Sequence, residues 1–204
     1  MSKKKFSRNK QEKIALIYKT FFNLILKQGY HKTSTNHLAK SAKISIGTIY
    51  KYFPKGKEDI VRKYFEESME TMLDREDLNK VNDVNMREFL RHFVSDLFKN
   101  HKENKGYNLA FRSAIQSDKT LHEAHKQKIY DLFKIRAQNL REINESFNII
   151  PEESLIDVFV FAFNLINAVI FHHLSVMKLF DTDNELIEYL LNLLIYSLKY
   201  ILKT

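Results

Sequence analysis

A short segment in the first third of the chain, Ser45 to Lys57, gathers hydroxyl, phenol and lysine side chains around a glycine. The segment is SIGTIYKYFPKGK. Hydroxyl and phenol groups both donate and accept hydrogen bonds, and ammonium groups carry positive charge. Side chains of these types can therefore bind phosphate oxygens and the edges of bases. Gly47 costs about 1 kcal/mol relative to alanine within a helix, which favours a place where another molecule approaches the backbone closely. The segment therefore predicts a contact with nucleic acid.

The distribution of charge agrees with this prediction. The chain has 204 residues and a formal net charge of +8. Residues 1–63 contain 16 Lys and Arg against 3 Asp and Glu, a balance of +13, whereas the remainder has a balance of −5. A basic end on a mildly acidic body suits a polyanion bound at one end, most simply nucleic acid. An anionic membrane surface is the competing partner, and a solvated lysine-rich surface is the plain alternative.

Helical patterns precede this segment. Apolar residues at helical spacing predict a helix from about residue 9 to 28 that Gly29 ends. Thr35 is expected to cap a second, short helix. The residues expected to face inward from that second helix are Leu38, Ala39 and Ala42.

The segment itself predicts a third helix. Ser45 is a good N-cap, and Ile49 and Phe53, four residues apart, mark the buried side. The outward positions are then Thr48, Tyr50, Lys51 and Tyr52. Three short helices in about 45 residues predict a helix-turn-helix module.

The composition predicts an all-α fold. The chain has only four glycines and two prolines, whereas sheet proteins need many turns, and 44% of its residues are hydrophobic. Further helical segments are expected at about 57–73, 86–103, 106–116, 119–147, 152–178 and 183–203, with a polar loop around 74–85. About nine helices are thus expected, divided into a module at 1–56 and a body at 57–204, with the helix at 57–73 linking the two.

The absence of cysteine excludes disulfides and thiolate metal sites. The N-terminus is basic but lacks an apolar run of the signal-peptide type. Both features suit a protein of the reducing cytoplasm, which is the expected location.

The stretch TSTNHLAKSAKISIGTIYKYFPKGKEDIV, preceded by a helix that ends in GY, resembles the DNA-binding module of TetR-family transcriptional regulators over about residues 10 to 63. The resemblance implies double-stranded DNA as a partner, a ligand pocket within the helical body and a homodimer formed by the last two helices. By motif position it implies DNA contacts from Thr33, Thr35, Ser45, Ile46, Gly47, Thr48, Tyr50, Lys51, Tyr52 and Lys57. Lys57 begins the fourth helix, where a backbone amide and the lysine meet phosphate. Ile46 departs from the family pattern, in which a polar or basic residue is frequent, and is expected either to touch a thymine methyl or to form apolar surface.

A ligand site in the body is specified only by residue type. Aromatic residues at helical spacing predict an apolar interior, and each is either a cavity wall or ordinary core. The candidates are Phe93, Phe111, Arg112, Gln116, Tyr130, Phe133, Phe163, Asn164, Asn167 and His172. Such walls favour a hydrophobic or planar ligand, and an inward Arg112 would admit a carboxylate or another anion.

The last two segments are the most apolar and approach the length of a membrane span. Polar residues such as Asp157 and Lys199 interrupt them and make insertion costly. Helices that are apolar on more than one face suit packing on their own body and on a second subunit. The expected interface residues of the homodimer are Phe161, Ile170, Leu190, Leu194 and Ile201.

The sequence shows no set of residues with an evident catalytic role, and the chain is expected not to be an enzyme. His122 and His125 in HEAH have an i, i+3 spacing that differs from the HExxH metal motif, and we interpret them as surface histidines. No phosphate-binding glycine loop or nucleophile elbow is present. No metal or cofactor is expected.

The predicted function is that of a homodimeric repressor that binds a near-palindromic operator and is released by a small hydrophobic or planar effector, with activation as the alternative sign of regulation. A TetR-like adaptor regulated by a protein partner is the second hypothesis. A basic protein of the membrane surface is the third, although no membrane partner is expected. A sizeable internal cavity favours the first hypothesis, whereas a filled core with an exposed apolar groove favours the second.

Overall fold

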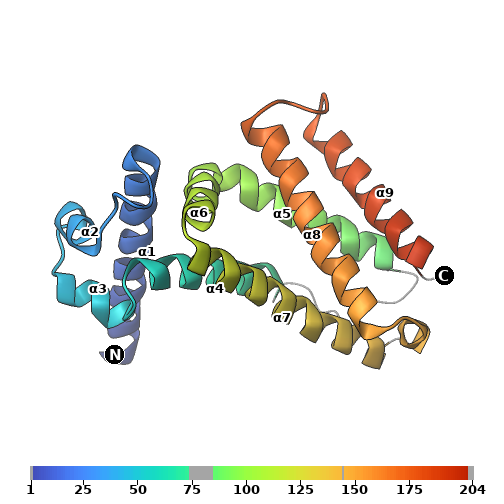
Figure 1. The fold of residues 1–204 in the computed structure, drawn as a ribbon, viewed down its shortest axis with the longest axis horizontal. Coiled ribbons are helices and arrows are strands. Elements are labelled where there is room, and N and C mark those ends of the chain that lie inside the picture. Colours follow the sequence, from blue (N-terminus) through green and yellow to red (C-terminus); the bar gives the residue numbers. More distant parts are fainter. Residues whose placement is uncertain (1, 74–84, 144, 202–204) are drawn as a thin grey trace. The chain divides into compact units, whose positions relative to one another are not determined.

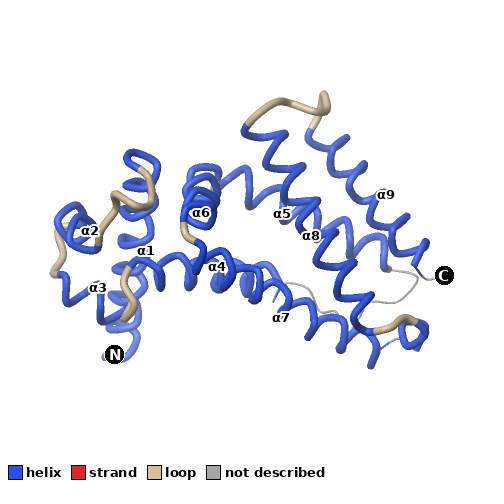
Figure 2. Tube along the Cα trace, in the orientation of Figure 1, coloured by secondary structure: helices blue, strands red, loops and turns tan. Residues whose placement is uncertain are grey.

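The computed structural model describes residues 2–73, 85–143 and 145–201, with side chains described for residues 9–69, 85–142, 145 and 147–200. In these ranges the chain forms nine α-helices and no strand, which confirms the all-α prediction (Figures 1 and 2). The helices are α1 Ser2–Gln28, α2 Thr35–Ala42, α3 Ile46–Tyr52, α4 Lys57–Leu73, α5 Met86–Glu103, α6 Lys105–Ser117, α7 Lys119–Ile143, α8 Glu152–Ser175 and α9 Asp183–Ile201. A short 3-10 segment, Glu145–Ile149, follows α7. The loop predicted around 74–85 lies outside the described residues except for its last position.

The chain divides into two compact units. The first comprises Met1–Met69 and Gly106–His125, and the second comprises Glu70–Lys105 and Lys126–Thr204. Helices α4 and α7 therefore contribute residues to both units. The predicted division of the chain after residue 56 was drawn from the sequence motif and not from the compact units of the structure. It remains a prediction about which residues bind DNA.

The first unit is built on a core that joins α1, α2, α3, α4 and α6. Its largest fully buried side chains are aromatic and aliphatic. They include Ile17, Phe21, Phe22, Tyr30, Leu38, Ile49, Phe53 and Ile60. Burial of this many large side chains is the main favourable term for the unit and fixes the orientation of the short helix α3.

Local signals set the ends of α1 and α2, with two corrections to the predictions. Gly29 ends α1 in the left-handed region, with φ of 83°, as predicted. However, α1 begins at Ser2 rather than near residue 9, because no glycine or proline interrupts this segment. The N-cap of α2 is Ser34 rather than Thr35, since the Ser34 hydroxyl accepts a hydrogen bond from the backbone N–H of His37 at 3.1 Å.

The turn between α3 and α4 is held by a buried carboxylate. Asp59 accepts hydrogen bonds from the backbone N–H of Lys55 at 2.8 Å and from the Arg62 guanidinium at 2.7 Å. Burial of Asp59 opposes ionisation, but these hydrogen bonds outweigh it and lower the pKa of the carboxyl. The turn is thereby fixed directly before the first residue of α4.

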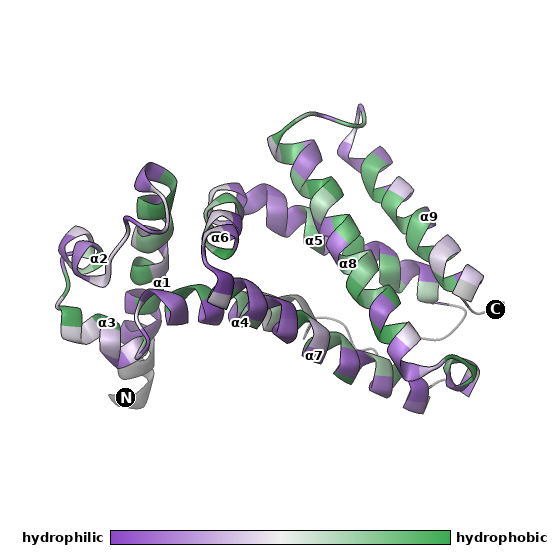
Figure 3. Cartoon of the chain, in the orientation of Figure 1, coloured by the Kyte–Doolittle hydropathy of each residue, from purple (hydrophilic) through white to green (hydrophobic). Residues whose placement is uncertain are grey.

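In the second unit, α5 packs against both α8 and α9. Polar contacts reinforce this packing, since Arg87 and Arg91 pair with Glu188 and Lys102 pairs with Asp183 at 2.7 Å. Figure 3 shows that α8 is largely hydrophobic along its length. Among the described residues, α8 is the one helix that is long and apolar enough to cross a membrane, judged by length and composition. In its most apolar 18-residue segment, 28% of the residues are buried.

Candidate nucleic-acid interface and ligand cavity

Helix α3 has a sharply divided surface. Ile49 and Phe53 are buried, as the sequence predicted. The opposite side exposes Ser45, Ile46, Gly47, Tyr50 and Lys51, while Thr48 and Tyr52 are partly buried. Because Ile49 and Phe53 are packed in the core of the first unit, the orientation of α3 and of its outward side chains is fixed.

The first turn of α3 is held by two hydroxyl groups. Ser45 Oγ accepts a hydrogen bond from the backbone N–H of Thr48 at 3.1 Å, and it lies 2.9 Å from Thr48 Oγ1. Both hydroxyls are thus oriented before any partner arrives. This pairing preorganises the N-terminal end of the helix, the end that enters the major groove in helix-turn-helix proteins.

Gly47 has no intramolecular reason to lack a side chain. A Cβ atom at this position would meet only Ser45 Oγ, at 3.8 Å, which is an ordinary contact, and Gly47 is not among the residues with positive φ. Glycine nevertheless lowers helix stability relative to alanine. The absent side chain therefore suits close approach by another molecule.

Tyr50 and Thr35 join α3 to α2. Their hydroxyl oxygens lie 3.2 Å apart, and the pair covers the turn at Gly56. Gly56 has a φ of 68°, and a Cβ atom there would lie 3.1 Å from Thr35 Cγ2 and 3.6 Å from the Tyr50 ring. The backbone conformation favours glycine here, and an added Cβ atom would be crowded against Thr35.

Thr33 and Lys57 are engaged within the first unit. Thr33 is buried, and its hydroxyl donates to the carbonyl of Gly29 at 2.9 Å, so it supports the turn between α1 and α2 rather than facing outward. The Lys57 ammonium lies over the Tyr30 ring, 4.0 Å from the ring centroid, and 3.4 Å from the Tyr30 carbonyl oxygen. These contacts hold the lysine at the N-terminus of α4, where an anion is also favoured by the helix dipole.

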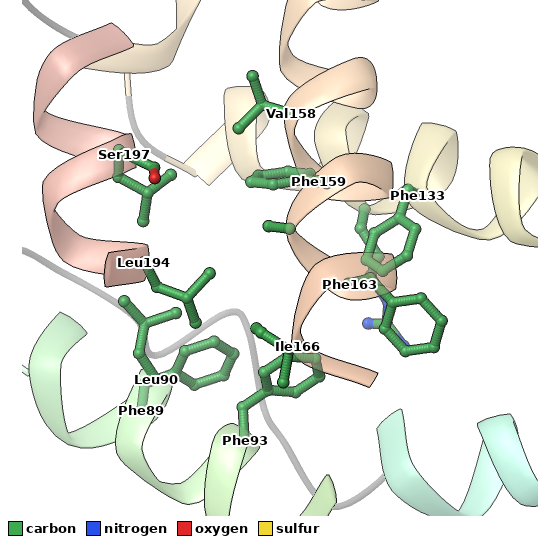
Figure 4. Close-up of a pocket in the computed structure, with 13 residues that line it drawn as sticks. Phe89, Leu90, Phe93, Phe133, Val158, Phe159, Phe163, Ile166, Leu194 and Ser197 are labelled. Carbon is green, nitrogen blue, oxygen red and sulfur yellow. The ribbon is translucent and has the colours of Figure 1, made fainter. Parts of the chain in front are cut away.

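A cavity of about 120 Å³ lies within the second unit (Figure 4). Side chains of α5, α7, α8 and α9 form its walls, and Figure 4 shows Phe89, Phe93, Phe159 and Leu194 around the common space. The lining residues are Phe89, Leu90, Phe93, Phe133, Arg136, Val158, Phe159, Ala162, Phe163, Ile166, Leu194, Ser197 and Leu198. The walls are therefore apolar apart from one guanidinium and one hydroxyl.

The sequence-predicted ligand residues do not form a single group. Phe93, Phe133 and Phe163 line the cavity. Phe111 and Arg112 belong to the first unit, where the Phe111 ring stacks against the Phe65 ring. Each of the other candidates lies outside the cavity lining: Gln116, Tyr130, Asn164, Asn167 and His172.

One of these polar candidates has a structural role. Asn167 Oδ1 lies 2.8 Å from His101 Nε2, joining α8 to α5. Of the adjacent histidines on α8, His173 rather than His172 is buried, and its Nδ1 accepts from the backbone N–H of Leu179 at 3.0 Å. The sequence pattern missed Arg136 and Ser197, although Arg136 follows the cavity residue Phe133 by one helical turn.

His125 differs from the surface histidine that the sequence suggested. Its ring centroid lies 4.3 Å from that of Phe65 and 5.3 Å from that of Phe111. Burial, followed by the nearby charges of His122 and Arg112, lowers the pKa of His125 to about 4. Across the described ranges, no group of three or more His, Cys, Asp or Glu residues is arranged to hold a metal ion.

Most of the predicted interface residues are buried in the core of the chain itself. Ile170, Leu190 and Leu194 lie in the core, and Leu194 also lines the cavity. The side chain of Ile201 lies outside the described residues. Phe161 is 67% exposed on α8, and Tyr196 is 70% exposed on α9.

An all-helical protein that supports an exposed, hydroxyl- and lysine-bearing third helix, and that has an apolar cavity in a separate unit, has the organisation of a helix-turn-helix regulator. The family model of bacterial regulatory proteins, tetR family, matches residues 17–64. Residues 17–64 therefore match the tetR family of bacterial regulatory proteins, and the structural likenesses that follow agree with this match.

The fatty acid metabolism regulator protein of Bacillus subtilis (strain 168) is 37% identical over 68 residues, which are 33% of this chain and 34% of the relative. The match thus spans about a third of that relative's length. The structure of the fatty acid degradation regulator FadR from Bacillus halodurans is similar with a TM-score of 0.68 and 25% identity, covering 90% of this chain and 94% of that one.

A TetR family transcription regulator from Marinobacter aquaeolei VT8 has the same fold, with a TM-score of 0.63 and 18% identity over 94% of this chain and 97% of that one. A TetR-like transcriptional regulator from Rhodococcus sp. RHA1 gives a TM-score of 0.60 at 13% identity, covering 91% of this chain and 94% of that one. These two likenesses concern the fold alone.

Proposed function

We propose that the protein is a cytoplasmic transcriptional repressor that binds a near-palindromic DNA operator as a homodimer and releases it when an apolar effector binds. The observation that carries the proposal is the divided surface of α3, with Ile49 and Phe53 buried and hydroxyl, phenol and lysine groups outward. Such a face can contact phosphates and base edges without disturbing the core that holds it.

The proposed DNA contacts follow from this geometry. Ser45, Thr48 and Tyr50 supply hydroxyl groups, and Lys51 and Lys57 supply positive charge. Ile46 is exposed at the start of α3, which suits apolar contact with a thymine methyl. Thr33 is left out of this set because its hydroxyl and its side-chain surface are used inside the unit.

The proposed dimer uses the exposed faces of α8 and α9. Phe161 and Tyr196 expose large aromatic surfaces that a second subunit would cover. Two recognition helices related by a two-fold axis would enter successive major grooves, so half-sites about 34–36 Å apart, or a related spacing, are expected.

The proposed effector is a molecule with a hydrocarbon chain. The cavity walls are almost wholly apolar, which favours such a guest. Two relatives are described as regulators of fatty acid metabolism and of fatty acid degradation, which agrees with this chemistry. Release of DNA requires only that the effector bind more tightly to a conformation with low DNA affinity.

The test has two stages. Genomic fragments retained by the purified protein are first sequenced to identify an operator, and titrations of that operator are then repeated with a saturating medium-chain fatty acid. Specific binding that weakens with the acid supports repression with effector release. Binding that strengthens supports activation, and failure to retain any specific fragment refutes operator recognition.

The adaptor hypothesis predicted a filled body core with an exposed apolar groove. The apolar cavity in the second unit is the observation that favours a small effector over a protein partner.

A further inference from the structure

One residue with a charged side chain, Arg136, belongs to a cavity lining that is otherwise apolar apart from Ser197. Arg136 lies on α7, one helical turn after Phe133, and both side chains line the cavity. Phe133, Ala137 and Leu140 are buried, so Arg136 sits at the edge of the inward face of α7 and is itself partly buried.

Within the described part of the chain, Arg136 has no carboxylate or carbonyl partner, in contrast with other arginines of the same unit. Arg87 and Arg91 pair with Glu188, and Arg141 donates to the carbonyl of Ile150. Each of those arginines stabilises the unit through its partner. The described residues supply no such partner for Arg136.

Ser197, the other polar group of the lining, does not replace Arg136 as an anion-binding group. Its hydroxyl donates a hydrogen bond to the carbonyl of Leu193 at 2.9 Å, so its one proton is already used. Only the guanidinium can therefore donate several hydrogen bonds to an anionic guest, and its planar fork matches a carboxylate or phosphate.

We propose that Arg136 binds the anionic end of the effector while the hydrocarbon chain occupies the cavity beside Phe133, Phe159 and Phe163. The inference rests on the proposed function, and it names the effector class as an alkyl chain ending in an oxyanion. The oxyanion is the carboxylate of a fatty acid or the phosphate of a phosphorylated acyl derivative. Both share the chemistry that a guanidinium recognises.

The test measures binding to the full chain by isothermal titration calorimetry with three probes of equal chain length: dodecanoate, dodecyl phosphate and dodecanol. The variants are Arg136→Gln, which removes the charge, and Arg136→Lys, which keeps it. Lys134→Gln is the matched control, since it removes the same charge from an exposed position on the same helix. Circular dichroism melts of all variants verify folding.

We expect Arg136→Gln to weaken binding of the preferred anionic probe about 10- to 100-fold, the scale of a charged hydrogen bond. Arg136→Lys retains part of the affinity, and Lys134→Gln and the binding of dodecanol remain unchanged. The tighter of the two anionic probes identifies the head group as carboxylate or phosphate. If Arg136→Gln binds that probe as tightly as the unmodified protein does, the role of Arg136 is refuted, whereas the proposal of an apolar effector is retained. If no probe binds the unmodified protein, both the inference and the proposed effector class fall.

Discussion

The hydroxyl oxygens of Thr35 and Tyr50 lie 3.2 Å apart and connect α2 to α3 at the surface of the first unit. The Tyr50 side chain is 45% exposed, so its hydroxyl is held in place by Thr35 while remaining open to solvent. A phenol that is both oriented and accessible is suited to a phosphate or base edge.

Replacing Tyr50 with phenylalanine tests this role. Tyr50→Phe should leave the melting temperature nearly unchanged, because the hydrogen bond that it removes is exposed, and should weaken operator binding by about 1 kcal/mol. Thr35→Val removes the same intramolecular bond but leaves the phenol, and should therefore weaken binding less. Ile49→Ala serves as the contrasting core variant and should cost about 2–5 kcal/mol of stability. A Tyr50→Phe protein that unfolds more easily yet binds normally when folded would show that Tyr50 is a packing residue.

Gly47→Ala should raise the stability of the fold and lower the affinity for the operator. The added methyl group meets only Ser45 Oγ at 3.8 Å, and alanine favours helix more than glycine does, so stability should rise by up to about 1 kcal/mol. Operator affinity should fall because the methyl group occupies the space into which DNA would come. Thermal melts and operator titrations check both effects, and unchanged affinity would mean that DNA does not approach this position.

The salt dependence of DNA binding tests the two lysines. Lys51→Ala or Lys57→Ala should weaken specific and non-specific binding alike, and should flatten the slope of log K against log salt concentration by about 0.9 for each phosphate that the protein no longer neutralises. Lys134→Ala, on α7, is the control and should leave the slope unchanged. An unaltered slope for Lys57→Ala would restrict Lys57 to its contact with Tyr30.

The elements of the fold were predictable wherever a local signal marked their ends. Helix α4, Lys57–Leu73, was predicted with its observed bounds because the preceding Pro and Gly end α3. The N-cap of α2 was assigned to Thr35 instead of Ser34, because two neighbouring hydroxyl residues are equivalent in sequence and differ only in backbone conformation.

The ligand cavity was harder to predict because it depends on which helices pack together. Phe93 and Phe111 have similar apolar surroundings in the sequence, yet only Phe93 lines the cavity. Likewise, Leu190 and Phe161 both belong to apolar helices, but Leu190 is buried within the protomer while Phe161 is exposed. Helical periodicity identifies apolar faces and does not say which neighbour covers each of them.

This difference in burial sharpens the test of the dimer. Phe161→Glu places a charge on a surface that is exposed in the protomer, so it should leave the protomer folded and produce monomers. Leu190→Glu should unfold the protomer, because the charge would enter its own core. Light scattering and circular dichroism distinguish the two results. A folded, dimeric Phe161→Glu protein would move the interface away from this face of α8.

The pH dependence of stability tests the environment of His125. Burial, aided by the charges of His122 and Arg112, lowers its pKa to about 4 in the folded protein, whereas the unfolded chain should have the ordinary value near 6.5. Between these values the unfolded state binds more protons than the folded state. The stabilisation is therefore fully present above about pH 6.5 and is lost as the pH falls toward 4, with a total of up to about 3 kcal/mol.

His125→Phe should fit between the rings of Phe65 and Phe111 and remove this titration. Urea unfolding at pH 7.5 and pH 5 should therefore show a smaller loss of stability for the variant, by about 2 kcal/mol, than for the unmodified protein. His92→Gln is the control for the loss of a histidine as such, because His92 is exposed on α5. Parallel pH dependences for His125→Phe and the unmodified protein would show that the imidazole is accessible to protons in the folded state, and that Phe65 and Phe111 do not shield it from water.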